Sequence, residues 1–255
     1  MTVTSPDPGR PVVTMRHGGG PPLVIAHRGA SASWAENTLS AFLAAWHAGV
    51  TWVEADTQPT ADGVPVLLHD RDLDRTTTGR GPVRAARYRD VARLTVRGRP
   101  GEWVPRLDDL LTMVTPGRAL LLELKGYHTS AQIRTVLAAV DGHGAAGRVL
   151  LQSFELEVLR ELHRADPDRP FGLLVTDLDA DPVARCRDLG AAYYNPSVGA
   201  LLRRPDVVPA LHAAGIGIAC WTADDPARWA ALAGAGVDAI ITNRPAALAA
   251  WQRRP

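Results

Sequence analysis

The chain has 255 residues, which is long for one ordinary domain and normal for one α/β barrel. Hydrophobic residues make up 46% of it, enough to bury a sizeable core. The formal net charge is +1 with both signs scattered along the sequence, so nothing indicates a nucleic-acid partner or a membrane-seeking surface. No apolar stretch approaches the roughly 20 residues that a spanning helix needs, so we expect no membrane insertion.

The start of the chain has no apolar run of signal-peptide length. We expect residues 1–22 to form a flexible tail, residues 23–255 to form one domain, and the protein to stay in the cytoplasm. The two cysteines, Cys186 and Cys220, lie far apart in sequence. They form no disulfide framework, and buried free thiols are the simpler interpretation.

Short runs rich in leucine or β-branched residues alternate with alanine-rich segments of helical period. The runs that predict strands are Leu23–His27, Trp52–Asp56, Val64–His69, Ala119–Lys125, Arg148–Phe154, Phe171–Val175, Ala191–Asn195, Gly215–Trp221 and Asp238–Asn243. The segments that predict helices include Asn37–Gly49, Leu107–Val114, Ser130–Val140, Glu155–Arg164 and Asp225–Ala233. This alternation favours a parallel sheet with helices outside it.

One of these nine runs does not fit an eight-stranded parallel barrel. Only a short stretch containing Asp62-Gly63 separates Trp52–Asp56 from Val64–His69, whereas a parallel crossover needs about a dozen residues or more. Asp-Gly predicts a hairpin, so Val64–His69 is expected to return as an antiparallel arm. The fold class is then a single (β/α)8 barrel with a hairpin arm, and the irregular segment Thr76–Val104 is expected to be an excursion at the top of the barrel.

Acidic residues end two neighbouring predicted strands, where barrel active sites are found. Glu54 and Asp56 end one strand and Glu123 ends the next parallel one. Taken alone, a Glu-x-Asp pair is about as often a solvated strand edge. Three carboxylates in one barrel mouth repel one another strongly, however, and a divalent cation resolves the repulsion. Oxygen-only ligands favour Mg²⁺ or Ca²⁺ over Zn²⁺.

Two histidines are expected beside this metal site. His27 ends the first strand, and His69 ends the returning arm. A two-residue turn at Asp62-Gly63 would pair residues whose numbers sum to 125, which places His69 opposite Asp56. Because histidine titrates near neutral pH, two histidines flanking a metal suit general acid–base catalysis.

Two cations and one aromatic residue complete the candidate site. Arg28 can hold a phosphate in a bidentate manner, and its other interpretation, an ion pair with one of the acids, is compatible with this role. Lys125 is the only lysine among the 28 Lys and Arg residues, and its compact charge suits a phosphate oxygen or the attacking group. Trp221 could stack on a substrate alcohol or pack in the core.

Several segments together resemble the glycerophosphodiester phosphodiesterase family, over nearly the whole chain from about Leu23 to about Pro245. They are HRGASASWAENTLSAF, EADTQPTADGVPVLLHDRDLDRTTTGRG, LLLELKG, LLQSF, CWT and GVDAIITNRP. The resemblance implies a barrel shared with phosphatidylinositol phospholipases. It also implies hydrolysis of a glycerophosphodiester, a small-molecule substrate, to sn-glycerol 3-phosphate and an alcohol. The residues it implies are Glu54, Asp56 and Glu123 as ligands of Mg²⁺ or Ca²⁺, His27 and His69 as the acid–base pair, and Arg28 and Lys125 as phosphate contacts.

The order of the chemical steps stays open at this point. One histidine would take a proton from the nucleophile and the other would protonate the leaving alkoxide. We favour His69 as the acid, because the hairpin can move it over the leaving group. The nucleophile is either water or the glycerol 2-hydroxyl.

Two departures from the family pattern bear on the substrate. Ala35 stands where the family often has proline, and Asn243 stands where it usually has aspartate. Two alternative functions are also considered. One is a lysophospholipase-D-like activity, which needs an apolar channel for an acyl chain. The other is a catalytically inactive binding barrel, which should have lost an acid or a histidine from the set.

Overall fold

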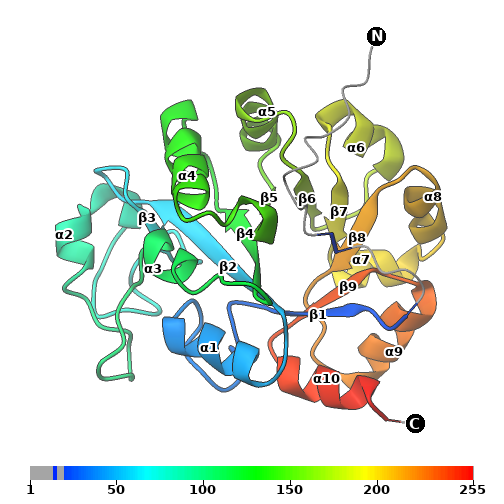
Figure 1. Ribbon diagram of the computed structural model, residues 1–255, viewed down its shortest axis with the longest axis horizontal. Coiled ribbons are helices and arrows are strands. Elements are labelled where there is room, and N and C mark those ends of the chain that lie inside the picture. The colour runs from blue at the N-terminus through cyan, green and yellow to red at the C-terminus, as the bar shows by residue number, and fades with distance from the viewer. Residues whose placement is uncertain (1–13, 16–19, 255) are drawn as a thin grey trace.

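A closed barrel of parallel strands forms the centre of the computed structural model, which describes residues 14–15 and 20–254 (Figure 1). Hydrogen bonding runs in the order β1-β9-β8-β7-β6-β5-β4-β2, and β1 also pairs with β2, so the described sheet closes on itself. The eight strands are β1 (Leu23–Ala26), β2 (Trp52–Pro59), β4 (Ala119–Leu124), β5 (Val149–Ser153), β6 (Phe171–Val175), β7 (Tyr193–Pro196), β8 (Gly217–Cys220) and β9 (Ala239–Thr242). The predicted barrel is confirmed.

Helices surround the strands on the outside of the barrel (Figure 1). They are α1 (Leu39–His47), α2 (Tyr88–Val91), α3 (Leu107–Leu111), α4 (Ser130–Gly142), α5 (Leu156–Ala165), α6 (Pro182–Leu189), α7 (Val198–Arg203), α8 (Val207–Ala213), α9 (Pro226–Ala235) and α10 (Pro245–Gln252), with 3-10 turns η1 (Val83–Ala85) and η2 (Ala146–Arg148). Local sequence fixes several ends: the side chain of Thr38 accepts from the backbone N–H of Ala41 and caps α1. Among the described helices, none has the length and apolar character needed to cross a membrane.

Apolar side chains fill the interior of the barrel toward the end where the strands begin. Ile25, Leu121 and Tyr193 are buried there in one cluster that also contains Met15, which is fully buried. The backbone N–H of Met15 donates to the hydroxyl of Tyr193 at 3.0 Å. Met15 thus packs at the end of the barrel where the strands begin, although it belongs to the segment expected to be a flexible tail. Residues 1–13 and 16–19 of that segment lie outside the described residues.

The hairpin arm exists, but its expected register is wrong by one residue. β3 (Pro65–Leu67) runs antiparallel to β2 and pairs Thr57 with Leu67, so paired numbers sum to 124 and not to 125. The connection is a three-residue loop, closed by the backbone N–H of Thr60 donating to the carbonyl of Val64 at 3.0 Å. Leu68, and not His69, therefore lies opposite Asp56.

The predicted excursion follows the hairpin and contains η1, α2 and several isolated bridges. It has an apolar cluster of its own, which draws residues from β3 as well: Val66, Leu68, Leu73, Val83, Val91 and Val104. Its attachment to the barrel therefore does not depend on polar contacts alone. Both cysteines are buried free thiols, as expected.

Candidate active site

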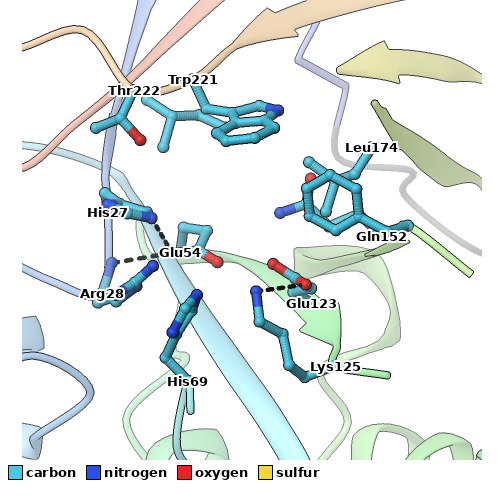
Figure 2. Close-up of a pocket in the computed structure, with 12 residues that line it drawn as sticks. His27, Arg28, Glu54, His69, Glu123, Lys125, Gln152, Leu174, Trp221 and Thr222 are labelled. Carbon is cyan, nitrogen blue, oxygen red and sulfur yellow. Dashed lines mark hydrogen bonds and ion pairs between the residues drawn. The ribbon is translucent and has the colours of Figure 1, made fainter. Parts of the chain in front are cut away.

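A cavity of about 230 Å³ opens at the carboxyl ends of the strands (Figure 2). Parallel strands bring their ends to one edge, which is why residues far apart in sequence meet here. All the predicted site residues line this cavity except Asp56, which is buried beside it at 1% exposure. The lining residues are His27, Arg28, Glu54, His69, Glu123, Lys125, Gln152, Phe154, Leu174, Trp221, Thr222 and Ile241.

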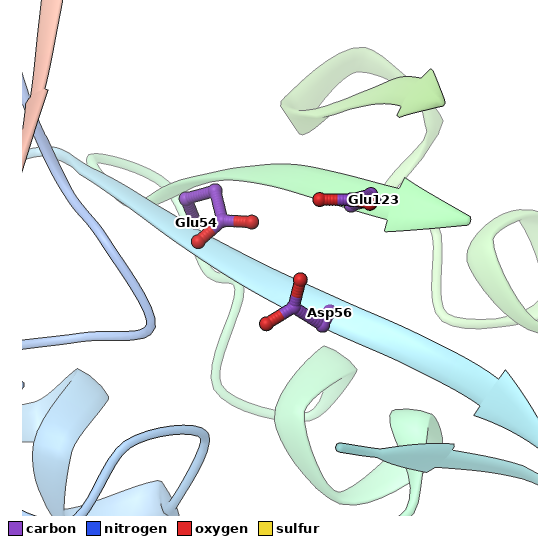
Figure 3. Close-up of side chains that lie close together, drawn as sticks. All are labelled: Glu54, Asp56 and Glu123. Carbon is purple, nitrogen blue, oxygen red and sulfur yellow. The ribbon is translucent and has the colours of Figure 1, made fainter. Parts of the chain in front are cut away.

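The three predicted carboxylates converge (Figure 3). Glu54 and Asp56 stand two apart on β2, and Asp56 is the register partner of Glu123 on β4. One oxygen from each lies within 4.8 Å of the others. Burial, and then the charge of Asp56, raises the pKa of Glu54 well above its usual value and the pKa of Glu123 to about 8. Burial opposes ionisation of Asp56 too, but Lys125 and Arg28 outweigh it and hold its pKa at about 2.

These residues fit a divalent cation. The buried oxygens Asp56 Oδ1 and Glu123 Oε1 accept no well-aligned hydrogen bond from the described residues. The ammonium of Lys125 lies 3.4 Å from the first and 2.8 Å from the second. Buried oxygens normally have partners, and hard cations prefer ligand sets made only of oxygen. The raised pKa values of Glu54 and Glu123 mean that ionising all three carboxylates is unfavourable unless a further positive charge lies among them.

The ring orientation of His27 follows from a chain of hydrogen bonds. Asp224 Oδ2 lies 2.6 Å from Asn243 Nδ2, and a carboxylate can only accept, so the amide nitrogen faces Asp224. The amide oxygen of Asn243 then faces His27 Nδ1 at 2.7 Å. Nδ1 therefore carries the proton, and Nε2 is the free acceptor, 4.0 Å from Glu54 Oε2. Burial, helped by the charge of Arg28, lowers the pKa of His27 to about 4.

His69 reaches the cavity by another route than the one expected. β3 ends at Leu67, and the chain then bends. The buried side chain of Gln58 holds the bend, because its Nε2 donates to the carbonyls of Leu68, His69 and Asp70 at 3.0, 3.1 and 2.6 Å. His69 Nδ1 lies 2.7 Å from Asp70 Oδ1. Its ring points into the cavity beside Arg28 (Figure 2).

Arg28 contacts several acids at once. Its backbone, in the left-handed region at φ 54, directs its N–H to Glu54 Oε2 at 2.9 Å. The guanidinium lies 3.1 Å from Asp56 and 3.0 Å from Glu36. The ion-pair interpretation of Arg28 is therefore correct, and its guanidinium still borders the cavity.

An apolar wall faces the charged groups. Phe154 and Trp221 meet edge to face, with ring centroids 5.4 Å apart and an interplanar angle of 88°. The indole N–H of Trp221 donates to the carbonyl of Asn195 at 2.8 Å, which fixes the ring. Leu174 and Ile241 also line the cavity. One part of a ligand would thus meet charge and another part would meet apolar surface.

Some residues of the site carried no sequence signal strong enough to assign them. Phe154 and Gln152 stand at a strand end, which was the available signal. Gln58 and Arg75 stood only within a segment that carried the family resemblance. The roles of both arise from contacts made only in the folded chain. Asn37 was noted only as the start of a helical segment, yet its Nδ2 donates to Asp56 Oδ2 at 2.9 Å.

Known proteins share this sequence and fold. A sequence model described as the glycerophosphoryl diester phosphodiesterase family matches residues 27–247. The chain is 30% identical over 234 residues to a glycerophosphodiester phosphodiesterase of Caldanaerobacter subterraneus, covering 89% of this chain and 96% of that one. It is 29% identical over 231 residues to a glycerophosphodiester phosphodiesterase of Bacillus altitudinis, covering 87% and 94%.

Solved structures agree with these matches. A glycerophosphodiester phosphodiesterase from Agrobacterium tumefaciens has a TM-score of 0.80 and 30% identity, covering 90% of this chain and 99% of that one. A phosphodiesterase from Oleispira antarctica, in complex with the product sn-glycerol-3-phosphate, has a TM-score of 0.85 and 26% identity, covering 90% and 96%. The chain therefore is an enzyme and belongs to the glycerophosphoryl diester phosphodiesterase family.

Proposed function

We propose that this phosphodiesterase hydrolyses glycerophosphodiesters to sn-glycerol 3-phosphate and an alcohol, using Mg²⁺ or Ca²⁺ held by Glu54, Asp56 and Glu123. The observation that carries the metal dependence is the convergence of three buried carboxylates within 4.8 Å, with two of their oxygens accepting no well-aligned hydrogen bond from the described residues. The product complex of the Oleispira relative supports the product assignment. A role in glycerophospholipid metabolism follows from the substrate class, and a cytoplasmic location remains a prediction.

The bound cation would supply positive charge to the phosphoryl oxygens and lower the pKa of a coordinated hydroxyl or water. The protein's own groups do the rest. His27 is the base in this proposal, because its free Nε2 faces the cavity and its low pKa keeps it unprotonated. His69 is the acid, because Asp70 holds its Nδ1 and leaves Nε2 to give a proton to the leaving alkoxide.

Arg28 and Lys125 would balance the charge of the phosphate, since both lie at the cavity wall next to the carboxylates. Phe154 and Trp221 would pack against the carbon atoms of the substrate. A cavity of about 230 Å³ suits a small diester. No observation specifically favours the acyl chain of a lysophospholipid.

A substrate panel tests the proposal. Glycerophosphocholine, glycerophosphoethanolamine and a lysophosphatidylcholine would be compared, with detection of the released choline or ethanolamine for all three and coupled detection of sn-glycerol 3-phosphate for the two glycerophosphodiesters. We expect turnover of the two glycerophosphodiesters, loss after chelation, and recovery with Mg²⁺ or Ca²⁺. Preference for the lysophospholipid, or full activity in protein shown to be free of metal, would contradict the proposal.

A thermal melt gives a second readout that does not depend on turnover. A cation that binds only the folded state raises the melting temperature. We expect this rise in the wild-type protein and its loss in Glu123→Gln, which keeps the shape of the side chain and removes its charge. Glu157→Gln on the exposed face of α5 is the matched control and should respond like wild type.

A further inference from the structure

Arg75 lies outside the residues described so far as catalytic or metal-binding, yet its guanidinium binds two carboxylates that contact residues of the cavity. It directly precedes the excursion, and its side chain is 49% exposed. Two carboxylates bind it: Glu36 from the loop before α1, and Asp70 from the bend after β3. These partners are 39 and 5 residues away in sequence.

The guanidinium uses two different edges for its two partners. Nη1 and Nη2 donate to Glu36 Oε2 and Oε1 at 2.8 and 2.7 Å. Nε and Nη2 donate to the two oxygens of Asp70, with Nη2 to Oδ1 at 2.8 Å. Only a planar fork can make both bidentate pairs at once, and a lysine ammonium cannot. This geometry sets Arg75 apart from an ordinary exposed ion pair, which contributes little.

Each of these two carboxylates also accepts a hydrogen bond from a residue that lines the cavity. The oxygen of Asp70 that accepts from Arg75 Nη2, Oδ1, also accepts from His69 Nδ1 at 2.7 Å. The oxygen of Glu36 that accepts from Arg75 Nη2, Oε1, also accepts from Arg28 Nη1 at 3.0 Å. His69 and Arg28 both line the cavity (Figure 2). One guanidinium therefore fixes the separation between the proposed acid and a proposed phosphate contact.

The fold does not need Arg75 to hold the excursion in place. The apolar cluster that includes Leu73 and Val83 anchors this segment. Two backbone hydrogen bonds also hold the chain on either side of Arg75. The N–H of Leu73 donates to the carbonyl of Gly81 at 2.9 Å, and the N–H of Thr77 donates to the carbonyl of Leu73 at 3.1 Å. Removing the guanidinium should therefore loosen Asp70 and Glu36 without unfolding the segment.

We propose that Arg75 is a positioning residue, which holds His69 and Arg28 in one geometry across the catalytic cavity through Asp70 and Glu36. This inference rests on the proposed function of that cavity. Positioning errors of about 1 Å can cost about 100-fold in rate, so the effect should fall on kcat. KM should change less, since the carboxylates and Lys125 stay in place.

The test compares Arg75→Ala, Arg75→Lys and Arg93→Ala on glycerophosphocholine. Arg93 is the matched control, because it is an exposed arginine of the adjoining excursion with no ion pair among the described residues. We expect kcat to fall at least tenfold in both Arg75 variants, with melting temperatures close to wild type. Arg93→Ala should keep wild-type kcat. Added guanidinium ion should restore part of the kcat of Arg75→Ala and should not change that of Arg75→Lys.

A double-mutant cycle with Asp70→Asn tests the route of the effect. If Arg75 acts through Asp70, the losses in kcat should be less than multiplicative in the double variant. Wild-type kcat in a folded Arg75→Lys protein, or multiplicative losses in the cycle, would overturn the proposal. If Arg75→Ala does not fold, Arg75→Lys decides alone, because it keeps the charge and the aliphatic stem.

A proton NMR measurement separates failure of this proposal from failure of the proposed function. The Nδ1 proton of His69 that is shared with Asp70 should be visible in wild type and Arg93→Ala and lost in Arg75→Ala. Its retention in Arg75→Ala overturns the positioning role whatever the activity. A wild-type protein that turns over no glycerophosphodiester, yet shows this difference, would refute the substrate and leave the positioning role standing.

Discussion

The ammonium of Lys125 forms ion pairs with two neighbouring carboxylates. Its Nζ lies 2.8 Å from Glu123 and 3.4 Å from Asp56. It also stands 5.6 Å from the centroid of the Phe154 ring. Burial alone lowers the pKa of Lys125, but the two carboxylates outweigh burial and raise it. The ammonium is therefore a charged group in a narrow space between an aromatic ring and the proposed metal ligands.

The geometry predicts that Lys125→Arg damages catalysis more than stability. A guanidinium is wider and planar, and it cannot occupy the position of a compact ammonium without moving its neighbours. We expect at least about a tenfold loss in turnover, since small displacements are costly here. The melting temperature should stay near the wild-type value. Steady-state assays paired with thermal melts measure both, and wild-type turnover in the folded variant would contradict the prediction.

The sequence predicted the site residues that lie at the ends of strands. It did not predict the residues that reach the site only through hydrogen bonds between side chains. Glu54 and Glu123 could be expected to meet, because parallel strands bring their carboxyl ends to one edge of the barrel. The pairing of His27 with Asn243 spans 216 residues and depends on the closure of β9 against β1. Asn243 was noted only as a departure from a family pattern. The role of Arg75 likewise required the folded positions of two loops.

At the scale of elements, the hairpin arm shows what a local pattern determines. Asp62-Gly63 correctly predicted a turn, and Gly63 adopts the left-handed region at φ 80. The pattern could not distinguish a two-residue loop from a three-residue one. The hydroxyl of Thr60 selects the longer loop, since it accepts from the backbone N–H of Val64 and donates to Asp62. One added residue changes which side of the arm each residue faces.

The bend after β3 compensates for this register, and Gln58 holds the bend. We predict that Gln58→Leu lowers turnover at least tenfold and lowers the free energy of unfolding by about 1–3 kcal/mol, because three carbonyls lose a donor. Gln252→Leu is the matched control. Among the described residues, the side chain of Gln252 makes one hydrogen bond, to the carbonyl of Pro22.

Turnover assays and urea unfolding of both variants measure these changes. Gln252→Leu should keep wild-type turnover. A Gln58→Leu protein with wild-type turnover would mean that the cluster around Leu68 and Leu73 holds His69 without help from Gln58.

Across the whole molecule, the two ends of the barrel differ in character. Apolar side chains and Met15 fill one end, whereas buried carboxylates occupy the other. The excursion is joined to the catalytic end by Arg84, which donates to the carbonyls of Lys125 and Tyr127 at 2.7 and 2.6 Å. His128 follows at once and is only 3% exposed. Stability at this joint therefore depends on keeping a buried histidine uncharged.

The state of His128 makes stability depend on pH in a defined direction. Its Nδ1 lies 3.1 Å from the carbonyl of Gly126, and its buried Nε2 has no partner within the described part of the chain. Burial lowers the pKa of His128 from 6.5 to about 4. Between these values the unfolded chain binds the proton more readily than the native protein. The contribution is therefore fully present above pH 6.5 and is lost as the pH falls toward 4.

This difference amounts to about 2 kcal/mol between pH 7.5 and pH 5, since one pKa unit corresponds to about 1.4 kcal/mol. Other groups titrate in the same range, so the prediction concerns a difference between two proteins. In His128→Asn the side-chain amide can still donate to Gly126, but it cannot take up a proton. Urea unfolding at pH 7.5 and pH 5 should show a loss of stability in the wild type that is about 2 kcal/mol larger than in His128→Asn. Equal losses in the two proteins would show that the native structure accommodates the charged imidazole, by admitting water or by moving the loop that joins the excursion to the barrel.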